Sequence, residues 1–240
     1  MGNIGIGGKM MTKTKIETCD YTFNPVIGCK NNCSYCYAKR INDRFKFIKN
    51  WNNPEWKEKS FNKKFPNKPQ RIFVGSMSEI YHWEKRWVRD TLNKVLEYPQ
   101  HTFQFLTKFS DIYSQWYFHP NCWLGVTITQ EKDFSKGISY DFICSKNITF
   151  LSIEPILEQI DPNLFSELNI NWVILGSESG KSKGKVIPKL DWITDIVEYC
   201  RNNKIPVYLK DSIMKLYPNL AFEYPNFHKF PGFYDKEEKR

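Results

Sequence analysis

Three cysteines lie close together near the start of the sequence, at Cys29, Cys33 and Cys36 in the stretch "GCKNNCSYCYAKR". Zinc prefers four ligands, so a zinc site would need one more, such as Cys19 or His82. A four-iron cluster usually takes four thiolates, so three would leave one iron with an open position. A redox pair of Cys33 and Cys36 is a third interpretation, but it leaves Cys29 without a role.

The composition places these cysteines in a globular protein. The chain has 240 residues, 41% of them hydrophobic, which is enough for one large α/β domain with a full core. Its seven cysteines are odd in number and are not spread as a disulfide framework would be. No apolar run approaches the roughly 20 residues that span a bilayer, and the N-terminus lacks a secretory signal. We therefore expect a cytoplasmic protein without a membrane partner.

Short apolar runs alternate with amphipathic ones along the chain. The apolar runs have the length and the β-branched, aromatic composition of buried parallel strands. They lie at 21–28, 71–75, 102–106, 122–126, 148–153, 172–175 and 205–209. Apolar residues at helical spacing lie between them at 88–98 and 190–203, the second with Asp191 available as a cap. The alternation predicts an α/β fold, either a parallel barrel or a doubly wound sheet.

The domain organisation predicted from these patterns is simple. Residues 1–14 are expected to form a flexible leader, 15–217 a single domain, and 218–240 an irregular C-terminal tail. The region at about 46–70 is too long and too polar for an ordinary connection, so it is expected to be a basic, aromatic insertion.

The cysteine spacing, with Tyr35 just before the last cysteine, resembles the signature of the radical S-adenosylmethionine (SAM) superfamily. Seven blocks of sequence resemble, more narrowly, an uncharacterised, phage-borne family of radical SAM-like proteins that is known as a domain of unknown function. The blocks are "TKIETCDYTFNPVIGC", "RIFVGSMSEIYH", "HTFQFLTK", "WLGVTI", "FLSIEPIL", "INWVILGSESG" and "IPVYLKD", and they run from Thr14 to Asp211. Two blocks differ from the family: 210–212 reads Lys-Asp-Ser in place of Lys-Gln-Trp, and Ser177 replaces a glycine.

The resemblance implies a fold and a chemistry. The fold would be a partial (β/α) barrel of six to seven parallel strands, radical SAM type. Cys29, Cys33 and Cys36 would hold a [4Fe–4S] cluster, and SAM would bind its open iron. An electron from a donor such as flavodoxin or ferredoxin would then cleave SAM and give a 5′-deoxyadenosyl radical.

The resemblance also implies roles for residues at strand ends. Tyr35 and the loop Gly75, Ser76, Met77 and Ser78, with Glu79 beside it, would bind the cofactor, the loop carbonyls taking its methionine amino group. Thr127 and Ser152 would bind the cofactor further along the chain. The catalytic candidates are Lys108, Glu154, Glu178 and Lys210. Charged groups are costly to bury unpaired, so these four could instead form a structural salt-bridge network.

The segment Lys39–Arg71 points to a partner. It carries eleven lysines and arginines against three acids, in a chain of formal net charge +9. Its aromatic residues are Phe45, Phe47, Trp51, Trp56, Phe61 and Phe65. Basic groups neutralise phosphates and aromatic faces stack on bases, so we expect nucleic acid to bind this segment. The radical that the resemblance implies would then modify or repair a nucleic acid base or nucleotide. Two alternatives stay open: the aromatics anchor the segment on the core, or the chain is a non-catalytic zinc-binding nucleic acid adaptor.

Overall fold

A computed structural model of the chain describes residues 10–179, 184–225 and 228–231. The chain divides into two compact units, Met1–Phe105 and Leu106–Arg240. The single domain expected over 15–217 stays a prediction.

Both predicted ends lie partly outside the described residues. Residues 1–9 of the leader and 226–227 and 232–240 of the tail are not described. The described end of the leader includes Met11, which is buried and donates its N–H to the carbonyl of Lys64 at 3.2 Å.

The first unit contains three neighbouring parallel strands. They are β1 (Tyr21–Phe23), β4 (Arg71–Val74) and β5 (Thr102–Thr107), and the last two residues of β5 lie past the unit boundary. The order across the sheet is β1, β4, β5, which is also the order along the chain. Apolar side chains from each strand are fully buried, so these strands form the centre of the unit.

The other elements of this unit are short, except for two helices. The helices are α1 (Tyr37–Phe45), α2 (Glu58–Phe61), η1 (Ile80–His82) and α3 (Lys85–Leu96), where a helix was predicted at 88–98. β2 (Val26–Ile27) pairs antiparallel with β3 (Glu55–Trp56). This pairing connects the predicted insertion at 46–70 to the segment just before Cys29.

The second unit contains four neighbouring parallel strands. They are β6 (Cys122–Ile128), β7 (Thr149–Ile153), β8 (Trp172–Leu175) and β9 (Val207–Leu209). They also follow one another across the sheet in chain order. Every residue of β7, β8 and β9 is buried, as expected for parallel strands covered on both faces. Since strand order reverses in a doubly wound sheet, the order in each unit favours a barrel.

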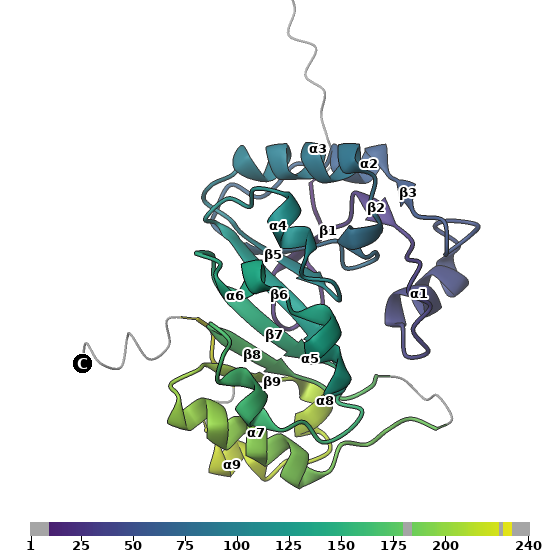
Figure 1. The fold of residues 1–240 in the computed structure, drawn as a ribbon. Coiled ribbons are helices and arrows are strands. Elements are labelled where there is room, and N and C mark those ends of the chain that lie inside the picture. Colours follow the sequence, from purple (N-terminus) through teal and green to yellow (C-terminus); the bar gives the residue numbers. More distant parts are fainter. Residues whose placement is uncertain (1–9, 180–183, 226–227, 232–240) are drawn as a thin grey trace, which may run out of the picture. The chain divides into compact units, whose positions relative to one another are not determined.

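Helices connect the strands of the second unit. They are α4 (Ile112–Gln115), α5 (Lys132–Gly137), α6 (Tyr140–Ile143), η2 (Pro162–Phe165), α7 (Leu190–Asn202), α8 (Asp211–Met214) and α9 (Leu220–Glu223). The long helix α7 lies next to β9 (Figure 1) and also contacts η2. Its predicted cap was wrong: the extended backbone of Lys189 places the cap there, so Asp191 is the second residue of the helix.

In the part of the chain that the structure describes, no helix has both the length and the apolar character needed to cross a membrane.

Candidate functional site

The cysteine segment joins the end of β2 to the start of α1. Cys36 is the N-cap of α1, and its Sγ accepts a hydrogen bond from the N–H of Lys39 at 3.3 Å. The Sγ of Cys29 accepts one from the N–H of Asn31 at 3.4 Å. Hydrogen bonds to coordinating sulfurs tune the potential of an iron–sulfur cluster, so the backbone around these thiols suits that group.

The thiols lie in a largely apolar environment. Cys29 and Cys36 pack against a buried cluster that includes Ala38, Trp51 and Met77. Burial raises the pKa of Cys29 to about 12 and also raises the pKa of Cys36. A thiol that serves disulfide exchange has a lowered pKa, so this environment disfavours the redox-pair interpretation. A bound metal centre is the usual means of holding buried thiolates, because its positive charge replaces the protons.

The three sulfurs of the cysteine segment do not form a preformed site for a single ion. Among the described residues, the three cysteines do not form a group whose ligand atoms all lie within 4.8 Å of one another. Sulfurs at about 2.3 Å from one tetrahedral zinc ion would lie about 4 Å apart. In a four-iron cluster each thiolate binds a different iron, which separates the sulfurs further. Three thiolates, one to each of three irons, are the donors that a [4Fe–4S] cluster with an open iron would need, and they need not lie as close together as zinc ligands.

The predicted cofactor loop forms a tight turn directly after β4. Gly75 has a φ of 74°, in the left-handed region that favours glycine, and a Cβ there would lie 3.1 Å from the ring of Trp83. The N–H of Ser78 donates to the carbonyl of Gly75 at 3.0 Å, and the indole of Trp83 donates to the Ser78 hydroxyl at 3.0 Å. The loop is thus held in one conformation by its own contacts.

Three hydrogen bonds connect this loop to the cysteine segment. The N–H of Gly28 donates to the carbonyl of Met77 at 3.0 Å, just before Cys29. The hydroxyl of Tyr37, just after Cys36, donates to the carbonyl of Ser76 at 2.6 Å. The side-chain amide of Asn31, between the first two cysteines, donates to the carboxylate of Glu79 at 3.4 Å. The predicted cluster ligands and the predicted cofactor loop therefore lie side by side in the first unit.

Sequence reasoning missed two residues of this arrangement, Asn31 and Tyr37. Both lie inside the quoted cysteine stretch, Asn31 between two predicted ligands and Tyr37 directly after the last one, and polar side chains in such positions are a usable signal. The imidazole of His82 also contacts the segment, with Nε2 at 2.7 Å from Oδ1 of Asn31. Burial lowers the pKa of His82. Tyr35, the remaining predicted cofactor residue, is half-buried between the second and third cysteines.

The polar residues of the second unit lie at the ends of its strands. Thr127 of β6 is in register with Ser152 of β7, so these two predicted cofactor residues are neighbours. Glu154 follows β7 and Lys210 follows β9, and the Lys210 Nζ lies 2.6 Å from a Glu154 carboxylate oxygen. Gly176 makes room for this pair, because a Cβ there would lie 2.8 Å from the Cγ of Glu154.

The other catalytic candidates also follow strands. Lys108 directly follows β5 and is half-buried, and Glu178 is buried two residues after Gly176. The block after Lys210, which differs from the family pattern, makes its own contacts: the N–H of Ser177 donates to the hydroxyl of Ser212 at 3.1 Å. The structure thus brings Glu154 and Lys210 together, and the roles of all these residues toward a cofactor stay predictions.

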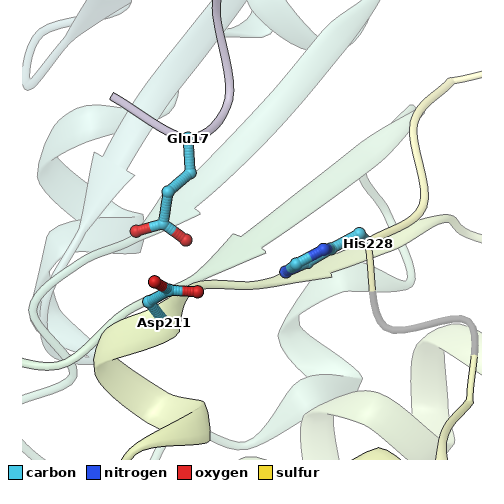
Figure 2. Close-up of side chains that lie close together, drawn as sticks. All are labelled: Glu17, Asp211 and His228. Carbon is cyan, nitrogen blue, oxygen red and sulfur yellow. The ribbon is translucent and has the colours of Figure 1, made fainter. Parts of the chain in front are cut away.

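One further pair of polar side chains lies in the second unit. Figure 2 shows Asp211, at the start of α8, and His228. A carboxylate oxygen of Asp211 and a ring nitrogen of His228 lie within 4.8 Å of each other, and the His228 ring stacks on Tyr208 at 4.5 Å. Glu17, also drawn, belongs to the first unit. Exposed groups of this kind are common on protein surfaces, so we assign no function to the pair.

The aromatic residues of Lys39–Arg71 divide into two kinds. Trp51 and Phe65 are buried in the core of the first unit, as the anchoring alternative expects. Trp56 and Phe61 are half-buried and pack on each other, with ring centroids 4.7 Å apart. Phe45 and Phe47 are exposed. Of these six aromatic residues, only the last two leave about half of their surface exposed.

Comparisons with known proteins place the chain in a family. The model of a family described as "Protein of unknown function (DUF5131)" matches residues 13–214. The chain belongs to this family. A comparison with curated proteins found no match for the DUF5131 chain.

Solved structures similar to the DUF5131 chain include several of spore photoproduct lyase. Two mutant forms of that enzyme match with TM-scores of 0.56 and 0.55 at 9% and 10% identity, covering 83% of this chain and 78% of each of those chains. A third structure, complexed with dinucleoside spore photoproduct, matches with a TM-score of 0.48 at 10% identity, and the match covers 73% of this chain and 60% of that one. The TM-scores above 0.5 confirm the predicted fold class, an α/β partial barrel with the fold of spore photoproduct lyase. Six to seven parallel strands were predicted, and the sheet has seven.

Proposed function

We propose that the chain is a radical SAM enzyme that modifies or repairs a nucleic acid base or nucleotide. Cys29, Cys33 and Cys36 hold a [4Fe–4S] cluster, and SAM binds its open iron. The observation that carries the proposal is the set of hydrogen bonds from the cysteine segment to the carbonyls of Ser76 and Met77 and to Glu79. The fold shared with spore photoproduct lyase supports it.

The residues of the first unit have defined tasks in this proposal. The carbonyls of the 75–78 loop bind the amino group of the methionine part of SAM. Each carbonyl has two lone pairs, so Ser76 can accept from both Tyr37 and the cofactor. The apolar residues around Cys29 and Cys36 exclude water from the cluster. A bound, reduced cluster would supply the one electron that cleaves SAM into methionine and a 5′-deoxyadenosyl radical.

The strand-end residues of the second unit have proposed roles of two kinds. Thr127 and Ser152, together with Lys108 and Glu178, bind polar groups of cofactor or substrate. The contact between Glu154 and Lys210 supports a positioning role for that pair, because each compensates the charge of the other. The electron comes from a cytoplasmic donor such as flavodoxin or ferredoxin.

The test is anaerobic incubation of the reconstituted chain with dithionite and SAM, followed by a measurement of 5′-deoxyadenosine. We expect a brown protein that forms 5′-deoxyadenosine, and the same from a control with alanine at the exposed Cys144. A colourless chain that holds one zinc ion and forms no 5′-deoxyadenosine would overturn the proposal in favour of a zinc-binding adaptor.

A further inference from the structure

Two exposed phenylalanine rings lie at the end of α1. Phe45 is 57% exposed and Phe47 is 48% exposed, and their rings stack with centroids 5.8 Å apart and planes 23° apart. The rings cover part of each other, and their exposed remainder leaves apolar area in water that burial would stabilise at about 25 cal/mol per Å². Since Trp51 and Phe65 of the same segment are buried, the exposure of this pair is not a general property of the segment.

The backbone that carries the two rings is held firmly. Asn42 is buried, and its side chain both donates to the carbonyl of Ile48 at 3.1 Å and accepts from the N–H of Ile48 at 3.0 Å. Ile48 is buried in the apolar cluster beside the cysteine segment. From the other side, Lys57 donates to the carbonyl of Phe47 at 3.2 Å. The rings are therefore presented in a fixed place, which reduces the entropy lost on binding.

Three basic residues lie near the pair in sequence, and one of them contacts a ring. The guanidinium of Arg44 lies 5.1 Å from the centroid of the Phe45 ring, and Lys49 is exposed nearby in sequence. Lys46 lies between the two phenylalanines in sequence and is the C-cap of α1, with a φ of 54°. Glycine is the usual residue in that left-handed conformation, so a lysine there keeps a charge beside the rings at some cost in backbone strain. The one acid of this turn, Asp43, lies 3.6 Å from Lys39 and is thus partly neutralised.

We propose that Phe45 and Phe47 form a stacking platform for an unpaired base of a single-stranded nucleic acid, with Arg44, Lys46 and Lys49 next to its phosphates. The inference rests on the proposed function for its substrate class. A base in a duplex has both faces covered by its neighbours, so open rings select single-stranded segments or bases taken out of the stack. Ring stacking does not depend on base identity, so we expect little sequence preference.

The test is fluorescence anisotropy of labelled oligothymidylate and oligouridylate with the anaerobically reconstituted chain. The double variant F45A/F47A should bind at least about fivefold more weakly, the lower end of what one stacked base contributes. F45Y/F47Y should bind like the wild type, because it keeps both ring faces. The matched control is Phe222→Ala, which removes an 86% exposed ring on α9 and should leave affinity unchanged.

A second variant tests the charge without unfolding the turn. Lys46→Gly relieves the left-handed strain while removing the cation, so it should not destabilise the chain. The slope of log affinity against log salt is negative, and this variant should make it shallower by about 0.7, the value for one phosphate contact on a single strand.

Three results would overturn the inference: no binding of either oligonucleotide at low salt, equal affinity of F45A/F47A and wild type, or a self-association that F45A/F47A abolishes. The last would make the pair a surface for a second copy of the chain. Binding and SAM cleavage are measured separately on one preparation. A chain that cleaves SAM but binds neither oligonucleotide overturns this inference and the nucleic acid substrate, and leaves the radical SAM chemistry standing. A chain that binds oligonucleotide without cleaving SAM overturns the radical SAM chemistry and leaves the stacking platform standing.

Discussion

The hydroxyl of Tyr37 donates a 2.6 Å hydrogen bond to the carbonyl of Ser76, and so joins the residue after Cys36 to the loop after β4. If that loop holds the methionine end of SAM, removing the hydroxyl should loosen the cofactor and spare the cluster. Tyr37→Phe should weaken SAM binding about fivefold, the usual size for one hydrogen bond. Equilibrium dialysis with labelled SAM and an iron assay measure the two effects.

Tyr117→Phe is the control for this change, since Tyr117 is 76% exposed in the second unit. If Tyr37→Phe lost iron as well, the hydroxyl would serve the folding of the cysteine segment instead of cofactor binding.

The three cysteines should act as a unit. Alanine at Cys29, Cys33 or Cys36 should reduce iron from about four per chain to near zero, because a cluster with two thiolates is not held. Alanine at the buried Cys122 or the exposed Cys144 should leave iron content intact. Iron and sulfide assays with electron paramagnetic resonance of the reduced protein decide the result.

Replacing Cys19 tests most directly whether the cluster has a fourth protein ligand. Its thiol is buried and lies 3.9 Å from the carbonyl of Ile16, a contact that does not need a metal. Cys19→Ala should therefore keep its iron. Loss of the cluster in this variant would mean a fourth protein ligand, and the open iron on which the proposed function depends would not exist.

The strands β7, β8 and β9 were predictable from sequence because every residue in them is buried. Trp172–Leu175 is a continuous apolar run for that reason, and it was predicted at its observed bounds. The two-residue strands Val26–Ile27 and Glu55–Trp56 leave no such pattern. A pair that short is stable only through its tertiary contacts, so propensity and periodicity do not reveal it.

The candidate site was predictable only in part. The metal prediction came from the spacing of the cysteines, and the polar candidates were chosen because they lie at strand ends. The hydrogen bond from Asn31 to Glu79 spans 48 residues, and such a contact has no local signature. Sequence could not separate Phe45, 57% exposed, from Trp51, 6% exposed, because both lie in one basic, aromatic segment and differ only in what packs over them.

The contact between Lys210 and Glu154 should contribute to stability. The two side chains are 16% and 31% exposed, so removing one leaves the other charge poorly solvated. Lys210→Met should lower the free energy of unfolding by about 1–3 kcal/mol, less than for a fully buried pair. Gly176→Ala should act in the same direction, because its Cβ would displace Glu154. Urea unfolding measures both.

Lys215→Met is the matched control, since Lys215 is 78% exposed and lies 3.8 Å from Asp211. It should change stability by less than about 0.5 kcal/mol. If Lys210→Met were equally mild, the positioning role proposed for the pair would be wrong.

Lys94 should hold the 46–70 insertion on the first unit. Its Nζ lies 4.7 Å from the ring centroid of Phe61 and 5.4 Å from that of Phe65, and it donates to the carbonyls of Phe61 and Lys63. Lys94→Met keeps the apolar stem and removes these bonds. It should cost about 1–2 kcal/mol of unfolding free energy, while the exposed Lys59→Met should cost almost nothing.

The effect of Lys94 should also depend on pH in a defined direction. Burial lowers its pKa below the usual 10.5, against the opposing charges of Glu97 and Glu58. Between the folded pKa and 10.5 the unfolded chain therefore binds more protons than the folded one, so the free energy of unfolding rises with pH in that window. The wild type should gain stability relative to Lys94→Met between about pH 7 and about pH 10, as measured by urea unfolding at both values. If the difference in free energy of unfolding between wild type and Lys94→Met narrowed with rising pH, the folded state would favour the charged amine. Burial would then not determine the pKa of Lys94.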